Sequence, residues 1–525
     1  MERLQPFLVR GTGESFAAEQ RRSYRTYVKQ LCSDNPYLRN LAQFLSESKP
    51  PSNSRICSID FYEGVSRPKV RANIDTEQLS AEIGKERAED INDSKCESGH
   101  VQHQRPLQGR IVVVEDLSRD IVELLGASLD IDPLFFALHL RAIDRGVSRQ
   151  QKPHEATLPS RLLPQGFFNI SYHRLLMSDE NVLPIGPGGT FLHDLNITRE
   201  LVILGSANIG LSQHCASVIR VKKRDRPWLA LILVDPPISS VYTSNDAERR
   251  RFRLDLRNYL GTHDNSVEPR PFSEWQDEDA ETSSVAQRGM FDDLQQYWNR
   301  ERPPSFNSSD PSIQSLSYHM LRVVAAEWVR YIAAMQKCLK QYEHSHDQLP
   351  ATSLGIYDRD LHELMGWRRR TLSSQSKIKS VLRFLAADQK TGEQQNYDLK
   401  YLSEDFEHIQ ERISAIGQHL ESTIPVIMSF VQIVDARRAF AETTNMSRLT
   451  VLALVFVPLT FVSSLFSMNT ENLPGSRGFW VYFAVAIPLT GLVVLVARPP
   501  PVVAALVMRV SQWIRKLERG VEYDA

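Results

Sequence analysis

The chain has 525 residues, of which 42% are apolar, and its 62 Lys and Arg residues are balanced by 63 Asp and Glu residues. This length allows two to four domains, and the average composition excludes a collagen, a disulfide scaffold and a wholly disordered chain. The near-zero net charge gives no reason to expect a nucleic-acid partner. The five cysteines are widely spaced and odd in number, which favours a reducing compartment. Residues 1–27 lack the apolar core of a secretory signal.

The first 313 residues predict a cytosolic α/β domain behind an N-terminal extension. Short apolar runs at 110–115, 215–221 and 228–234 predict strands, and residues 121–129 and 132–140 predict short helices. We assign residues 1–104 to a partly disordered extension and residues 105–313 to the α/β domain. Within that domain, the acidic segment 272–284 and the Pro- and Ser-rich segment 301–312 are interpreted as mobile linkers.

Residues 314–448 predict a helical stalk. Two long helices are expected at 314–342 and 358–387, followed by a third with a heptad seam. The seam consists of Leu402, Phe406, Ile409, Ile413, Ile416, Leu420, Thr423, Ile427, Phe430 and Val434. Gly417 and Pro425 weaken this helix locally. The acidic residues Glu404, Asp405, Glu407 and Glu411 form either a solvated helix face or an intersubunit metal sensor.

Two uncharged apolar segments, at 449–466 and 479–497, predict a two-helix transmembrane domain over residues 449–497. Each approaches the roughly 20 residues that cross a bilayer core. Arginines cluster before the first segment and after the second, whereas the loop between them has only Arg477. The positive-inside rule therefore places both termini in the cytoplasm. The remaining residues, 498–525, predict an amphipathic C-terminal tail.

A second pattern lies on the first of these segments. Residues spaced alternately by four and three, and mostly small or hydroxylated, form what we call the small-residue stripe: Met446, Thr450, Ala453, Val457, Thr460, Ser464 and Ser467. Such a stripe is expected to face either a partner helix or water. The pattern alone leaves tight helix packing and a pore lining both open, and a pore would require a ring of several chains, because two spans cannot enclose a channel.

The end of this segment resembles the CorA-type metal ion transporters. The resemblance rests on Val457-Pro458-Leu459-Thr460-Phe461, then Ser467-Met468-Asn469 with the acidic Glu471 beyond it, and then a second span. It implies a homopentamer whose five first spans line a pore. It also implies a filter at Asn469 that holds the metal through its hydration shell, a pore-lining Thr460, an outer-mouth acid at Glu471 and a gate at Met446 and Leu449. The chain departs from the family's Gly-Met-Asn triplet at Ser467.

We therefore predict an α+β membrane protein with an N-terminal α/β cytosolic domain, a long helical stalk and two C-terminal transmembrane helices. The expected function is a Mg²⁺-type divalent cation channel, not an enzyme, in the plasma membrane. The expected pore and selectivity residues are Asn469, Met468, Ser467, Ser464, Thr460, Val457 and Ala453. No cofactor is expected apart from Mg²⁺ as transported and regulatory ion, and the expected partners are lipid, divalent ions and further copies of the chain. The alternatives are a Zn²⁺ or Ni²⁺ transporter and a non-conducting membrane-anchored scaffold.

Overall fold

A computed structural model of the chain describes residues 23–47, 54–65, 67–83, 106–140, 166–178, 190–193, 195–204, 209–221, 227–238, 240–243, 251–253, 256–258, 289–300, 302–348, 354–388, 397–468 and 480–497. The chain divides into two compact units. The first comprises Met1–Leu349 with Arg359–Ile424, and the second comprises Pro350–Asp358 with Pro425–Ala525.

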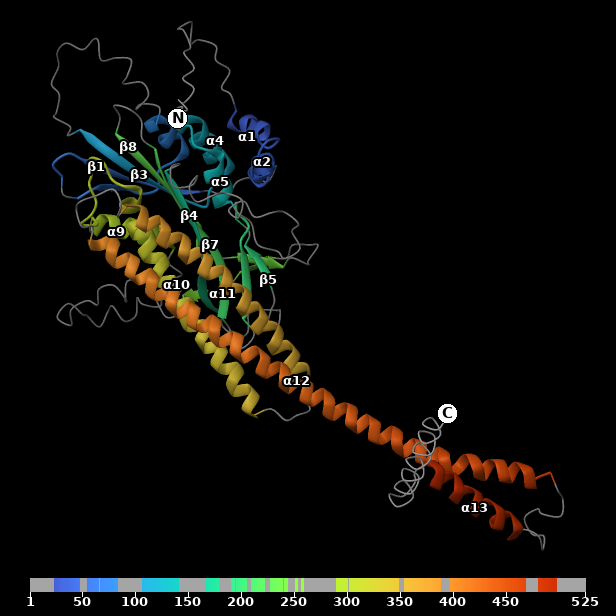
Figure 1. The fold of residues 1–525 in the computed structure, drawn as a ribbon. Coiled ribbons are helices and arrows are strands. Elements are labelled where there is room, and N and C mark those ends of the chain that lie inside the picture. Colours follow the sequence, from blue (N-terminus) through green and yellow to red (C-terminus); the bar gives the residue numbers. More distant parts are fainter. Residues whose placement is uncertain are drawn as a thin grey trace, which may run out of the picture. The chain divides into compact units, whose positions relative to one another are not determined.

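The first unit is built on a mixed β-sheet, which has eleven strands in the described residues (Figure 1). The main path of the sheet runs β10-β9-β5-β6-β7-β8-β3-β1-β2, while β4 pairs with β7 and with β11. The strands are β1 (Arg55–Tyr62), β2 (Lys69–Arg71), β3 (Leu107–Glu115), β4 (Phe167–Ser178), β5 (Thr190–His193), β6 (Glu200–Leu204), β7 (Ile209–Val221), β8 (Trp228–Val234), β9 (Ser240–Thr243), β10 (Arg251–Arg253) and β11 (Leu256–Asn258). Strands β3 and β8 are parallel, and the other described pairings are antiparallel.

The three strands predicted from apolar runs are confirmed as parts of β3, β7 and β8. The apolar cores of β3 and β8 are buried, because helices cover both faces of the sheet at this point. Strand β1 lies before residue 105 and pairs with β3 along its whole length, from Arg55 opposite Glu115 to Tyr62 opposite Leu107. This part of the predicted extension therefore belongs to the same sheet as the strands that follow it.

One face of the sheet is covered by α1 (Tyr24–Leu31), α2 (Arg39–Ser46), α4 (Arg119–Leu129) and α5 (Pro133–His139). The predicted helices at 121–129 and 132–140 are confirmed as α4 and α5. Helix α5 begins at Pro133, and the Asp132 side chain accepts a hydrogen bond from the Leu134 backbone N–H at 2.8 Å. The Tyr24 hydroxyl donates to the Ile131 carbonyl at 2.8 Å, so α1 is anchored to the turn before α5.

The opposite face is covered by α9 (Met290–Arg300) and α10 (Ile313–Gln348). The connection between them was predicted as part of a mobile linker, and this interpretation is wrong for the described residues 302–310. Phe306 packs against the rings of Trp298 and Phe61, with centroids 5.2 and 4.9 Å apart. The Trp228 indole N–H donates to the Ser308 carbonyl at 2.8 Å. The Pro- and Ser-rich composition suggested a mobile segment, but a single aromatic residue, Phe306, fixes it to the sheet.

The predicted long helices are confirmed as α10, α11 (Leu354–Asp388) and α12 (Tyr397–Phe466). The seam of α12 is buried from Leu402 to Ile427 in chain order, with Thr423 partly exposed. Gly417 lets α12 approach α11 closely, because a Cβ atom at this position would lie 3.2 Å from the Thr371 methyl carbon. Beyond Ile427 the expected seam is no longer covered, since 47% of Phe430 is exposed in the single chain.

The second unit contains the rest of α12, from Pro425, and α13 (Trp480–Ala497). Helix α12 continues through Pro425 and Pro458 without interruption. Within the described residues, α12 is the helix that is long and apolar enough to cross a membrane, and α13 is a shorter apolar helix.

Candidate ion-conduction site

The small-residue stripe follows the last six turns of α12 and ends at Ser467, directly after the helix. Two of its hydroxyl groups donate hydrogen bonds to the backbone of the helix itself. The Thr450 hydroxyl donates to the Met446 carbonyl at 2.8 Å, and the Thr460 hydroxyl donates to the Val457 carbonyl at 2.9 Å. Each hydroxyl oxygen keeps lone pairs that can accept a hydrogen bond from water.

Another face of α12 packs against α13. Val462 is 3% exposed and Ala486 of α13 is 1% exposed, and the rings of Phe466 and Tyr482 are in edge contact with centroids 6.1 Å apart. Pro458 is buried on the same face of α12 as Val462. The small Ala486 side chain allows the two helices to come close together.

All seven residues of the small-residue stripe are exposed in the single chain, including Met446 at 70% and Val457 at 65%. At 3.6 residues per turn, the stripe and the face of Pro458 and Val462 lie roughly opposite each other around α12. Packing against α13 therefore does not account for the stripe. Both interpretations, packing against a helix of another chain and a pore lining, stay open.

The other predicted site residues differ in how far the structure describes them. Met446 and Leu449, the predicted gate, are exposed on the same side of α12 as the stripe. Ser467 and Met468 are the last described residues of this segment, and both are exposed. The Ser467 backbone N–H donates to the Ser463 carbonyl at 3.0 Å, a helical bond that serine makes as readily as glycine. Asn469 and Glu471, like the tail at 498–525, lie outside the described residues.

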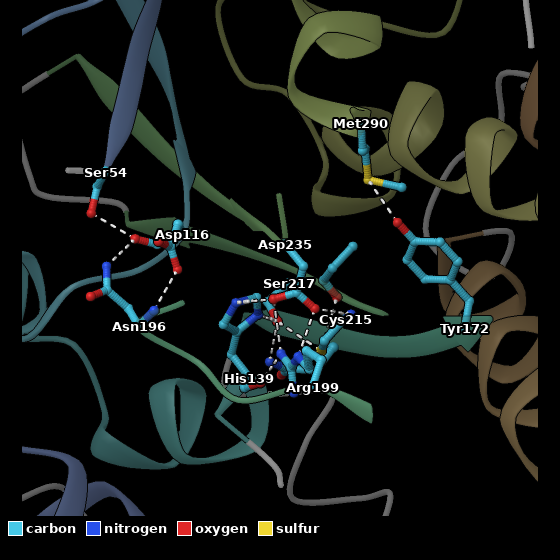
Figure 2. A network of polar contacts seen from close by, with 12 residues as sticks. Ser54, Asp116, His139, Tyr172, Asn196, Arg199, Cys215, Ser217, Asp235 and Met290 are labelled. Atoms are coloured by element: carbon cyan, nitrogen blue, oxygen red, sulfur yellow. Dashed lines mark hydrogen bonds and ion pairs between the residues drawn. The ribbon is translucent and has the colours of Figure 1, made fainter. Parts of the chain in front are cut away.

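A polar cluster that the sequence analysis missed lies in the core of the first unit (Figure 2). Asp235, just after β8, accepts three hydrogen bonds: from Arg199 Nε at 2.8 Å, from Arg199 Nη2 at 3.0 Å and from the Cys215 backbone N–H at 2.6 Å. Burial alone would raise the pKa of Asp235, but Arg199 holds that pKa below its usual range. Arg199 also donates to the His139 carbonyl at 2.8 Å.

His139 and Ser217 extend this cluster, with His139 Nδ1 2.8 Å from the Ser217 hydroxyl. The residue types Ser, His and Asp are those of a hydrolytic triad, yet the geometry differs from one. His139 Nε2 is 3.8 Å from Asp235 Oδ1, whose nearer partner is Arg199, and all three side chains are buried. Burial lowers the pKa of His139 to about 4, so its ring is neutral at physiological pH. The cluster ties β7, β8 and α5 together and offers substrate no access.

Within the part of the chain that the structure describes, no group of three or more His, Cys, Asp or Glu side chains is placed to hold a metal ion. The acidic stalk residues lie along α12, where burial raises the pKa of Asp405.

Comparison with known proteins identifies the C-terminal part of the chain. Residues 290–498, from α9 to the end of α13, match the family model described as CorA-like Mg²⁺ transporter protein. Over this segment the chain is similar to the CorA-like family, and we call the segment the CorA-like domain. The resemblance to the CorA-type family is therefore confirmed, and the matched segment includes all of α10 and α11. Members of this family are transporters rather than enzymes.

Two solved structures are similar to the chain at low identity. One is the CorA magnesium transporter from Methanocaldococcus jannaschii, at 11% identity over 86% of this chain and 99% of that one, with a TM-score of 0.37. The other is the full-length CmaX protein, at 12% identity over 85% of this chain and 98% of that one, with a TM-score of 0.33. No curated protein matches the chain.

Proposed function

We propose that this protein is a divalent cation channel of CorA type that carries hydrated Mg²⁺ through a pore lined by the small-residue stripe. The observation that supports the pore is the position of the stripe, which is uncharged, rich in hydroxyl groups and roughly opposite the face that packs on α13. The CorA-like domain at 290–498 supports the ion class. In this proposal α12 and α13 both cross the plasma membrane, with both termini in the cytoplasm.

The chemistry of the stripe suits a cation that keeps its water. Mg²⁺ prefers oxygen ligands and sheds its hydration shell reluctantly. Water bound to Mg²⁺ is a strong hydrogen-bond donor, so a compatible wall presents acceptors. Thr450 and Thr460 present acceptor oxygens because their hydroxyl protons are already donated to the helix backbone. A path of weak oxygen contacts also lets the ion leave, as conduction requires.

The remaining residues take the roles that the family resemblance implies. Asn469 forms the outer filter by hydrogen bonding to the hydration shell, Ser467 and Met468 flank it, and Glu471 raises the local cation concentration at the mouth. Met446 and Leu449 form the hydrophobic gate at the other end. A pore of this kind requires a ring of chains, and we propose a homopentamer. Cytosolic Mg²⁺ that bridges subunits would favour the closed state.

Mg²⁺ flux into liposomes tests this proposal. Purified Asn469→Ala protein is expected to take up Mg²⁺ more slowly than the parent protein, or with lost ion preference. Asn472→Ala is a matched control, because it removes the same type of side chain only three residues later in the sequence. Equal Mg²⁺ uptake by Asn469→Ala and the parent protein would contradict the proposal that Asn469 forms the filter.

Two further measurements separate the alternatives. Competition by Zn²⁺ and Ni²⁺ in the flux assay decides between Mg²⁺ and another divalent ion, a question that Ser467 raises because it replaces the family's glycine. Native mass in detergent decides between a channel and a membrane-anchored scaffold. A monomer or dimer without ion flux would overturn the channel assignment.

A further inference from the structure

A second cluster of charged groups lies where the sheet meets α9, the helix at which the CorA-like domain begins. Glu115 is the last residue of β3 and Arg55 is the first residue of β1, and the two are directly paired in the sheet. Arg55 Nη1 donates to Glu115 Oε2 at 2.9 Å, and Arg55 Nη2 donates to Asp292 Oδ1 of α9 at 2.6 Å. The Arg55 guanidinium also lies over the Phe291 ring, 4.4 Å from its centroid. One arginine therefore joins the sheet to the first turn of α9.

The two carboxylates that share this arginine approach the same place. A Cβ atom built on Gly289 would lie 3.0 Å from Glu115 Oε1 and 3.7 Å from Asp292 Oδ2. Glu115 is buried, and its Oε1 atom has no hydrogen-bonding partner among the described residues. A buried carboxylate oxygen that lacks a donor is costly, and a second carboxylate beside it raises the cost further. Protonation of Glu115 lowers both penalties, because it removes one of the two negative charges.

We propose that Glu115, Arg55 and Asp292 form a proton-binding joint, in which uptake of one proton by Glu115 strengthens the attachment of α9 to the sheet. The joint lies within the first unit and does not depend on which ion the protein conducts.

The groups that face Glu115 are consistent with proton uptake near neutral pH. Burial raises the pKa of Glu115 to about 7, Asp292 and Asp116 also raise it, and Arg55 opposes them. A carboxyl group whose pKa is raised in the folded state stabilises that state at low pH, and this contribution is lost as pH rises through about 7. When the joint opens and Glu115 is hydrated, its pKa returns towards the ordinary value of about 4.3. Opening is therefore easier at pH 8 than at pH 6.

Hydrogen exchange of the α9 amides in the full-length protein, in detergent, measures this opening directly. After correction for the intrinsic exchange rates, protection of α9 is expected to be about tenfold greater at about pH 6 than at about pH 8, as a single site with these two pKa values requires. Glu115→Gln is expected to abolish the difference. Glu77→Gln is a matched control, because it makes the same change at an exposed position and should keep the difference.

A second variant keeps the test decisive if Glu115→Gln does not fold. Asp292→Asn removes one of the two carboxylates and should shift the midpoint of the protection change to lower pH. His319 of α10, which stacks on Tyr297 of α9 at 5.6 Å, is unchanged in both variants. If the pH dependence of α9 protection comes from His319, it would persist in Glu115→Gln, and this result would refute the proposal of a proton-binding joint.

Equal α9 protection at about pH 6 and about pH 8 in the wild-type protein would also refute the proposal of a proton-binding joint. The same experiment with EDTA and then with millimolar Mg²⁺ tests whether the carboxylate pair binds a metal cation instead. Protection that follows Mg²⁺ and not pH would assign the pair to a metal ion and overturn the proposal of a proton site.

Discussion

The buried ion pair between Arg199 and Asp235 makes a strong prediction about the stability of the sheet. Asp235→Ala removes the acceptor of three hydrogen bonds, two from Arg199 and one from the Cys215 backbone N–H. Both charged side chains are at least 97% buried, so Asp235→Ala takes away the carboxylate that balances the arginine charge in the protein interior. Removing one partner of a buried pair costs about 3–5 kcal/mol, and we expect this loss in the free energy of opening of β7 and β8.

Hydrogen exchange of the β7 and β8 amides in the full-length protein measures this free energy. Replacing both partners, as Arg199→Met with Asp235→Leu, is the informative control, because apolar residues of similar volume often substitute for a buried pair at little cost. We expect the double variant to be more stable than Asp235→Ala alone. If Asp235→Ala lowers the free energy of opening by less than about 1 kcal/mol, Arg199 finds water or another acceptor. This result would refute the prediction that the buried pair stabilises the sheet.

Three further predictions follow from other contacts. His214 is buried, and within the described part of the chain neither of its ring nitrogens has a hydrogen-bonding partner. Burial lowers the pKa of His214 to about 3, so the stability of the fold falls as pH drops below the unfolded pKa of about 6.5. His214→Phe should flatten this acid limb in thermal unfolding, and an unchanged limb would contradict the attribution of the limb to His214. Gly109→Ala places a Cβ 2.1 Å from the Trp228 ring and should cost about 1–3 kcal/mol, measured by thermal unfolding; no loss would mean that Trp228 moves freely. Thr460→Val should reduce Mg²⁺ flux several-fold, whereas Thr490→Val, which removes the same hydroxyl from α13, should not; equal fluxes would argue against a pore-lining Thr460.

The strands that sequence reasoning identified are those whose burial is explained by their own composition. Residues 228–234 are apolar throughout and are predicted with the bounds that β8 has. Strand β1 was missed because Ser58 and Asp60 interrupt its apolar residues, and both are buried. Asp60 is paired with Arg110 at 2.7 Å, and this partner is 50 residues away in the chain. A single sequence does not reveal which distant residue will neutralise such a charge.

The same distinction applies to the candidate conduction site. The small-residue stripe was predictable because its residues are neighbours on one helix, where spacing alone determines which face they share. Its exposure opposite the packed face was not predictable, because that depends on how α13 lies against Val462. The residues of the proton-binding joint come from three separate elements, and no local pattern connects Arg55, Glu115 and Asp292.

The direction of the threonine hydroxyls bears on which sign of charge the proposed pore would admit. Thr450 and Thr460 have committed their only polar hydrogens to backbone carbonyls, so what they offer outward is electron density. The aquo shell of a chloride ion turns its own oxygens outward and would meet repulsion there, since it seeks donors. In the proposed pore, a ring of such helices would therefore favour hydrated cations over hydrated anions, although its wall carries no formal charge.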